Sequence, residues 1–214
     1  TNVEIHYIGD LPARTGLGSS SSFTVGLLHA LHALKGEMVS RQQLAEEAVY
    51  VEQEIIKERV GVQDQYTCAH GGLVNLKFSR EGHIQTCPVP LLKGRIEDFQ
   101  NHLMLFYTGI VRFAHEVLDE QIERTKKGTI TKDLSHLSDL VDEGLSVLSS
   151  EVSIEVFGEL LHNAWETKRK LSNKISTPAI DGFYERARNA GAVGGKLLGA
   201  GGGGFLLFVV PPDK

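Results

Sequence analysis

The sequence predicts an α+β protein that is built in two parts. A hairpin signal covers residues 71–86, where two strand-like segments flank a turn. The composition then changes at Pro88 to Arg95, where two prolines and a glycine indicate a linker. Beyond the linker, three or four helical segments stand between strand-like segments. We therefore expect one domain over residues 1–95 and a second domain over residues 96–214.

The first part opens with residues 3–8, an alternating segment whose β-branched and aromatic side chains predict a strand. A helix is expected to follow the next glycine-serine segment and to end at Gly36. Ser40 and Gln43 stand three residues apart and form a capping-box start for a helix over residues 41–58. The predicted hairpin comes after this second helix.

The second part begins with an apolar strand over residues 102–107. The helices expected after it cover residues 112–126, 133–149, 154–172 and 178–189. The last of these has Thr177 before Pro178, which is a good N-cap followed by proline at the first helical position. A glycine-rich segment and a strand over residues 205–210 complete the predicted elements.

The segment from Leu11 to Phe23 carries the strongest functional signal. Gly16 and Gly18 allow backbone angles that other residues resist, and the serines that follow are favoured N-cap residues. A helix N-terminus offers unpaired N–H groups and the positive end of the helix dipole, which attract anions. The segment lacks the lysine of a Walker A loop and the third glycine of a dinucleotide fingerprint. It predicts a phosphate-binding loop, with a simple turn before a core helix as the alternative.

One carboxylate stands on the apolar face of the second predicted helix. At about 100° per residue, one arc of this helix holds Ala45, Ala48, Val49, Val51, Ile55 and Ile56. Glu52 falls in the middle of that arc. A lone carboxylate in such a place is costly unless it is paired, hydrogen-bonded or bound to a metal. Glu52 is therefore a candidate cation ligand, and a buried ion pair with a lysine or arginine is the alternative.

A second glycine cluster, Gly199 to Gly204, stands between two apolar strands. Each glycine costs about 0.5–1 kcal/mol of extra entropy in regular structure, and a hairpin turn needs only one or two. The cluster therefore predicts a backbone that something must approach closely.

Composition and charge exclude several functions. The formal net charge of −5 gives no support for a nucleic-acid or anionic-membrane partner. No segment approaches the roughly 20 apolar residues of a membrane span, and no signal peptide precedes the first motif. Cys68 and Cys87 are too few for a disulfide scaffold or a zinc site, which favours reduced thiols in a cytoplasmic protein. His29 and His32 have no third ligand at a useful spacing for a metal.

Two motifs resemble those of the GHMP kinases, the family of galactokinase, homoserine, mevalonate and phosphomevalonate kinases. The sequence Pro12-x-x-x-Gly16-Leu17-Gly18-Ser19-Ser20-Ser21 is similar to the family's ATP-phosphate loop. The sequence from Lys196 to Phe205 is similar to its C-terminal glycine-rich motif. The resemblance implies a ribosomal protein S5 domain 2-like domain followed by a ferredoxin-like domain, with the ATP and sugar sites in the cleft between them. It also places one family motif before Thr1 and a closing helix and strand after Lys214, so we expect a fold truncated at both ends.

The resemblance also implies the roles of individual residues. In galactokinase-like members a glutamate helps to hold Mg²⁺, and the aspartate of a Gly-x-x-Asp-Gln sequence serves as base. Residues 61–65 match that sequence, although Arg59-Val60 replaces the proline or cysteine often found before it. The implied base is Asp64. The implied Mg²⁺ ligands are Glu52 and Ser20, with Glu54 and Ser19 as second choices. The implied ATP-binding residues are Pro12, Gly16, Leu17, Gly18, Ser19, Ser20 and Ser21.

Three segments are most similar to the D-glycero-D-manno-heptose 7-phosphate kinase branch, namely residues 107–114, 180–187 and 191–204. This similarity implies ATP-dependent phosphorylation of the anomeric hydroxyl of a heptose 7-phosphate to the 1,7-bisphosphate, for nucleotide-activated heptose biosynthesis. A substrate with its own phosphate needs a cationic clamp, for which Arg112 and Lys196 are candidates and solvated surface charges the alternative. The expected substrate-binding residues are Arg112, Lys196, Gly201, Gly202 and Gly203. The alternatives are a fucokinase or galactokinase-like enzyme, or a non-catalytic nucleotide-binding module on the same fold.

Overall fold

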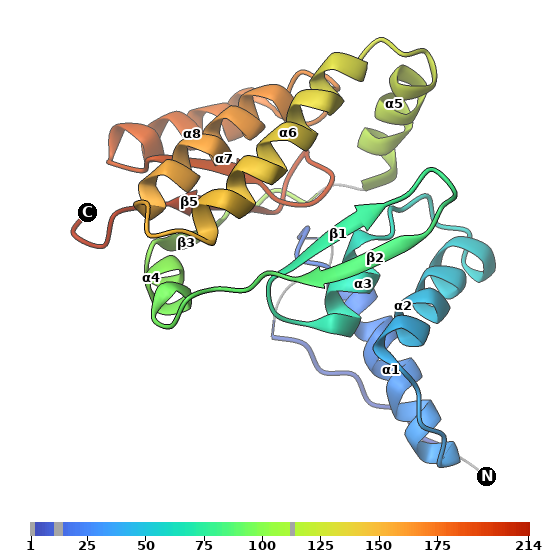
Figure 1. Cartoon of the computed structure of the whole chain (residues 1–214). Helices are drawn as coiled ribbons and strands as arrows, with labels where there is room; N and C mark the ends of the chain where they lie inside the picture. The colour runs from blue at the N-terminus through green and yellow to red at the C-terminus, as the bar shows by residue number, and fades with distance from the viewer. Residues whose placement is uncertain (1–2, 11–14, 112–113) are drawn as a thin grey trace.

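The computed structural model describes residues 3–10, 15–111 and 114–214, and its elements fall into two groups (Figure 1). The first group consists of α1 (Ser19–Lys35), α2 (Arg41–Tyr50), the π-helix η1 (Val51–Ile55), α3 (Gln63–His70), β1 (Val74–Phe78) and β2 (Ile84–Pro88). The second group consists of α4 (Arg95–Asn101), β3 (Leu103–Tyr107), α5 (Ala114–Lys126), α6 (Thr131–Leu148), α7 (Ile154–Lys168), α8 (Pro178–Asn189), β4 (Gly194–Leu197) and β5 (Phe205–Val209). Within the described residues, no helix is both long and apolar enough to cross a membrane.

All the strand pairs in the structure are antiparallel, as expected for an α+β fold. The predicted hairpin is confirmed, because β1 pairs with β2 from Val74 opposite Pro88 to Phe78 opposite Ile84. The second sheet has the order β3-β5-β4, so the apolar strand β5 lies in the middle. A central strand loses both edges to its neighbours and is therefore the most buried. Leu206, Phe208 and Val209 of β5 are accordingly at most 1% exposed.

Helices cover one face of this three-stranded sheet (Figure 1). In a buried cluster, the ring of Tyr184 on α8 contacts the rings of Trp165 on α7 and Phe208 on β5. Helix α7 lies so close to β4 that a side chain at Gly194 would collide with the backbone of Gly158. This close packing fixes the position of β4 and of the glycine-rich segment that follows it.

The first group is held together by packing of α1, α2 and α3. The predicted cap is confirmed, because the Ser40 side chain accepts a hydrogen bond from the Gln43 N–H. At the far end of α1, His32 lies between two carboxylates, with 2.9 Å from Nδ1 to Glu37 and 2.7 Å from Nε2 to Glu47. The hydrogen bond to Glu47, and next the one to Glu37, raise the pKa of His32. This contact ties the end of α1 to α2.

Residues 3–8 do not form the predicted strand. They have no regular secondary structure, and Val3, Ile5, Tyr7 and Ile8 are all more than half exposed. A strand needs a neighbour that supplies hydrogen bonds to its backbone, and the described part of the chain pairs no strand with these residues. The alternating pattern is present, but the pairing partner is not.

The second helix also differs from its prediction. The expected helix over residues 41–58 ends as an α-helix at Tyr50 and continues as the π-helix η1. A π-helix has i→i+5 hydrogen bonds, which rotate the following side chains away from the phase of an α-helix. Ile55 and Ile56 were expected on the buried arc and are instead 61% and 57% exposed.

Three further boundaries differ. The predicted linker of residues 88–95 leads into the short helix α4, which was not expected, and the helix predicted over residues 154–172 ends at Lys168. Asp64, expected in a loop, lies in the first turn of α3. Short polar helices such as α3 and α4 carry too little apolar periodicity to be predicted from a pattern alone.

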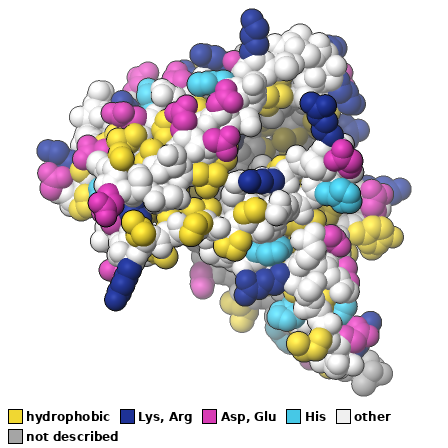
Figure 2. All heavy atoms as spheres, in the orientation of Figure 1, with side chains coloured by type: hydrophobic (Ala, Val, Ile, Leu, Met, Phe, Trp, Pro, Cys, Tyr) yellow, Lys and Arg dark blue, Asp and Glu magenta, His cyan; other side chains and the backbone are white. Residues whose placement is uncertain are grey.

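The two groups of elements meet through backbone contacts. The Phe205 N–H donates to the Thr15 carbonyl at 3.2 Å, which joins the segment before α1 to the start of β5. On the surface, the Arg59 guanidinium donates to Asp119 at 2.8 Å. The division into domains at residue 95 remains a prediction. Figure 2 shows acidic and basic side chains interspersed over one face, in keeping with the small net charge.

Candidate active site

The glycine-serine segment forms the loop that begins α1. Gly16 and Gly18 have φ angles of 78° and 70°, a region that favours glycine. Gly18, rather than a serine, is the N-cap residue, and no side chain caps the helix. The first N–H groups of a helix have no partner within it, so those of the first turn of α1 are available to an anion. The predicted phosphate-binding character of the loop therefore rests on backbone N–H groups more than on serine caps.

Glu52 is buried at 2% exposure and lies in the π-helix η1. Its Oε2 accepts hydrogen bonds from the Gln65 Nε2 at 2.6 Å and the Ser21 Oγ at 3.3 Å. Among the described residues, the Glu52 Oε1 and the neighbouring Gln65 Oε1 are buried and have no hydrogen-bond partner. Two unpaired buried oxygens are costly, and both are suitable ligands for a hard cation.

The structure decides which serine contacts Glu52. Ser21 is buried and donates to Glu52, whereas Ser20, the predicted Mg²⁺ ligand, is exposed and one residue away. The Ser20 carbonyl accepts from the Thr24 hydroxyl, and its own hydroxyl remains open to solvent. The oxygens of this site therefore fit a Mg²⁺ ion between Glu52 and the start of α1. The described residues hold no cluster of three or more His, Cys, Asp or Glu side chains around a metal position, and Mg²⁺ needs only one or two protein oxygens.

Asp64 lies beside the phosphate-binding loop. A Cβ atom on Gly18 would lie 3.5 Å from the Asp64 Cγ and 3.6 Å from its Oδ2, so the carboxyl group packs against this glycine. Asp64 is open to solvent, and it has no hydrogen-bond or ion-pair partner among the described side chains. Partial burial raises the pKa of Asp64 above the ordinary value of an aspartate. A carboxylate without a partner beside the predicted phosphate-binding loop is able to accept a proton, which is the chemical requirement for a general base.

The second glycine cluster packs against the chain itself. The Gly202 N–H donates to the Ile175 carbonyl at 2.8 Å, and the Gly204 N–H donates to the Ile110 carbonyl at 2.8 Å. Gly202 and Gly203 are buried, and a side chain at Gly203 would collide with the Ile110 carbonyl. The predicted close approach is therefore present, and the group that approaches is the protein backbone.

The same cluster touches the phosphate-binding loop. A Cβ atom on Gly199 would lie 2.8 Å from the Gly16 Cα, and one on Gly204 would collide with the Thr15 carbonyl. The two glycine segments, predicted separately, are thus brought into direct contact. A ligand bound at the glycine-serine loop would therefore also lie close to the Gly199–Gly204 segment.

The remaining predicted residues are placed as follows. Lys196 is half-buried on β4, and Leu17 and Ser19 are half-buried in the loop and the first turn of α1. Pro12 and Arg112 lie outside the described residues. Sequence reasoning assigned no role to two polar residues at the site. These are Gln65, which donates a hydrogen bond to Glu52, and Lys168, whose Nζ donates to the Gly199 carbonyl at 2.6 Å. Gln65 ends the Gly-x-x-Asp-Gln sequence and was within reach of the motif, whereas no pattern indicated Lys168.

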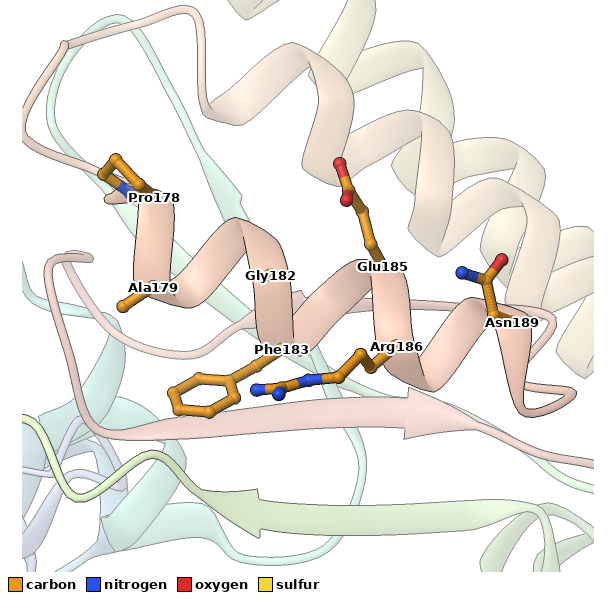
Figure 3. Close-up of a pocket in the computed structure, with 7 residues that line it drawn as sticks. All are labelled: Pro178, Ala179, Gly182, Phe183, Glu185, Arg186 and Asn189. Carbon is orange, nitrogen blue, oxygen red and sulfur yellow. The ribbon is translucent and has the colours of Figure 1, made fainter.

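Two hollows on the surface do not contain the Glu52–Asp64 site. One, of about 510 Å³, lies along α8 and is lined by residues of that helix, where the Arg186 guanidinium covers the Phe183 ring at 5.1 Å (Figure 3). The other, of about 600 Å³, lies between α1, α2 and α3 and is lined in part by Ser22 and Cys68. This second hollow lies near the glycine-serine loop, since the Sγ atom of its lining residue Cys68 is 3.9 Å from the Gly18 carbonyl oxygen.

Comparisons with known proteins match both parts of the chain. Residues 1–72 match the family described as "GHMP kinases N terminal domain", and residues 150–214 match "GHMP kinases C terminal". The chain is 27% identical to D-glycero-alpha-D-manno-heptose 7-phosphate kinase of Campylobacter jejuni over 98% of its length, and 30% identical to galactokinase of Pyrococcus furiosus over 96%. It spans 62% and 64% of the lengths of these two relatives.

The fold agrees with solved structures. A D-glycero-D-manno-heptose 1-phosphate kinase from Bacteroides thetaiotaomicron superposes with a TM-score of 0.73 at 22% identity, over 95% of this chain and 56% of the other. At this identity the likeness shows the fold alone.

Proposed function

Because this chain belongs to the GHMP kinase family, we propose that it takes part in ATP-dependent phosphorylation of the anomeric hydroxyl of D-glycero-D-manno-heptose 7-phosphate, which gives the 1,7-bisphosphate. The observation that carries the proposal is the position of the free Asp64 carboxyl group against Gly18 of the phosphate-binding loop. A nucleotide-binding module would need the loop but no base beside it. We choose heptose phosphate over other sugars as the proposed acceptor because three segments resemble the heptose 7-phosphate kinase branch, namely residues 107–114, 180–187 and 191–204.

The groups of the site divide the work of phosphoryl transfer. The N–H groups of the loop and of the first turn of α1 bind the β- and γ-phosphates, which carry the negative charge that the helix dipole attracts. Asp64 orients the acceptor hydroxyl and takes its proton as the sugar oxygen bonds to the γ-phosphorus and the bond to ADP breaks. Arg112 and Lys196 are proposed to contact the sugar phosphate. The Gly201–Gly203 segment is proposed to shape the wall of that site, since the Gly202 N–H already donates to the Ile175 carbonyl.

Mg²⁺ would be held by Glu52 with Ser21 or Ser20, and when bound it supplies charge neutralisation of the β- and γ-phosphates. Gln65 keeps the Glu52 carboxylate in place through its hydrogen bond to Oε2. This leaves Oε1 of Glu52 as the free ligand atom. The role of Gln65 is therefore to orient a metal ligand.

The acceptor is tested with a coupled ATP-consumption assay on the purified full-length protein, with heptose 7-phosphate, fucose and galactose as separate acceptors. Turnover that is fastest with the heptose phosphate supports the proposed reaction. A preference for galactose or fucose keeps the reaction class and replaces the substrate. ATP binding without acceptor-dependent turnover would contradict the kinase assignment and favour a nucleotide-binding module.

Replacing Glu52 by glutamine should raise the Mg²⁺ concentration needed for half-maximal activity by about tenfold or more, because a neutral amide is a poorer ligand for this hard cation. The measurement is a Mg²⁺ titration of activity at fixed ATP. Glu54→Gln is the matched control, since Glu54 is exposed two residues away and was the second choice for this role. Equal Mg²⁺ dependence in both variants would mean that Glu52 has only a structural function.

A further inference from the structure

Two lysines lie near each other, and one of them contacts the glycine-rich segment. Lys168 is the last residue of α7 and Lys196 lies on β4, the strand against which α7 packs. Both side chains are half-buried. The Lys168 Nζ donates to the Gly199 carbonyl at 2.6 Å, and Lys196 has no hydrogen-bond or ion-pair partner among the described side chains.

No carboxylate in the described part of the chain neutralises this pair. Two carboxylates on α7 and α8 bind Arg169 instead, with 3.1 Å between Arg169 and Glu166 and 3.6 Å between Arg169 and Asp181. Asp181 also accepts a hydrogen bond from the Ser176 hydroxyl at 2.6 Å. Burial and then the neighbouring Lys196 lower the pKa of Lys168 to about 7, and burial lowers the pKa of Lys196. Two half-buried ammonium groups without a counter-charge are costly, and an anion between them would relieve that cost.

Lys168 and Asp64 are connected to different residues of the glycine-serine loop. Gly199, which binds Lys168, contacts Gly16 of the loop, whereas Asp64 contacts Gly18. The phosphates of ATP already have the N–H groups at the start of α1. The uncompensated lysines are therefore better matched to a second phosphate, and the acceptor of the proposed reaction carries one.

We propose that Lys168 and Lys196 together bind the phosphate group that the acceptor sugar already carries. This inference rests on the proposed function and adds Lys168 as a residue that determines specificity for a phosphorylated acceptor. A phosphate dianion accepts charge-assisted hydrogen bonds from both ammonium groups, which are stronger than the single bond of Lys168 to a carbonyl. A sugar without this phosphate leaves the pair unneutralised.

The test compares Lys168→Gln and Lys196→Gln with the wild-type protein in acceptor kinetics. We expect the KM for heptose 7-phosphate to rise about 10- to 100-fold in each variant. This is the change that follows from the loss of one hydrogen bond between charged groups. The KM for ATP and the kinetics with unphosphorylated heptose should be unchanged. Lys174→Gln is the matched control, because Lys174 is exposed and lies in the loop after α7. Thermal unfolding of each variant checks the fold, and Lys196→Gln breaks no hydrogen bond or ion pair between described side chains.

A second measurement separates this inference from the proposed function. Calorimetric titration with heptose 7-phosphate, with inorganic phosphate as a competitor, reports binding without turnover. Loss of binding in both glutamine variants, with retention in Lys168→Arg, supports the subsite even if no acceptor is phosphorylated. Wild-type binding in both glutamine variants overturns it, and so does a rise confined to the KM for ATP, which would assign the lysines to the nucleotide.

Discussion

Replacing Asp64 by asparagine should lower kcat about 10²- to 10⁴-fold, the usual contribution of a general base. Asparagine keeps the size of the side chain beside Gly18 but cannot accept the proton of the acceptor hydroxyl. ATP affinity should change little, because the phosphates are bound by backbone N–H groups of the loop. The measurements are steady-state kinetics for kcat and equilibrium titration for ATP. Asp142→Asn, on an exposed position of α6, is the control and should behave as the wild type.

The pH dependence of kcat gives the same residue a second signature. Burial raises the pKa of Asp64, so its carboxyl group stays protonated to a higher pH than an ordinary aspartate. Only the ionised form accepts a proton, and the rate should therefore fall as the pH drops through this raised pKa. The fall should be absent from the residual activity of Asp64→Asn. A variant that keeps more than about a tenth of the wild-type kcat would exclude Asp64 as the base.

Replacing Gly204 by alanine should destabilise the protein by about 2–5 kcal/mol, because two penalties act together. Its φ of +96° disfavours any residue with a Cβ atom, and that atom would collide with the Thr15 carbonyl. The Thr15 carbonyl must then move, and with it the hydrogen bond to the Phe205 N–H. We expect a lower midpoint of denaturant unfolding and, in the fraction that folds, a raised KM for ATP.

Gly36→Ala is the matched control for Gly204→Ala. Gly36 has a φ of +73°, but a Cβ atom there would meet nothing within 4 Å. The loss should therefore be limited to the backbone penalty of about 1–2 kcal/mol, with no change in the KM for ATP. If the two variants lose equal stability, the contact between the loop and the glycine-rich segment contributes nothing beyond the backbone angle of Gly204.

Most of the secondary structure and the burial of Glu52 could be predicted from the sequence. Hydrophobic period and turn residues predicted the hairpin, the long helices and the strand β5, because these signals are local to each element. The caps at Ser40 and Thr177 were found for the same reason. Helical phase alone placed Glu52 on the buried face, where it lies at 2% exposure.

Which side chains and segments come into contact could not be predicted from the sequence, because it depends on tertiary packing. Residues 3–8 have a strand pattern, but a strand also needs a neighbour, and pairing is not encoded in one segment. The π-helix places Ile55 and Ile56 at the surface, because its i→i+5 hydrogen bonds change the helical phase on which the prediction depended. Ser21 rather than Ser20 reaches Glu52 for a similar reason, because a rotation of one residue turns a helical side chain by about 100°.

The contacts of the glycine segments belong to the tertiary structure as well. The abundance of glycine predicted a close approach, but Gly16 and Gly199 are 183 positions apart in the chain and come together where the segment before α1 meets the start of β5. The packing of α7 on β4 places Lys168 against the Gly199 carbonyl and beside Lys196. A lysine at the end of a helix carries no local signal of such a role, because its function depends on charges that only the folded chain brings near it.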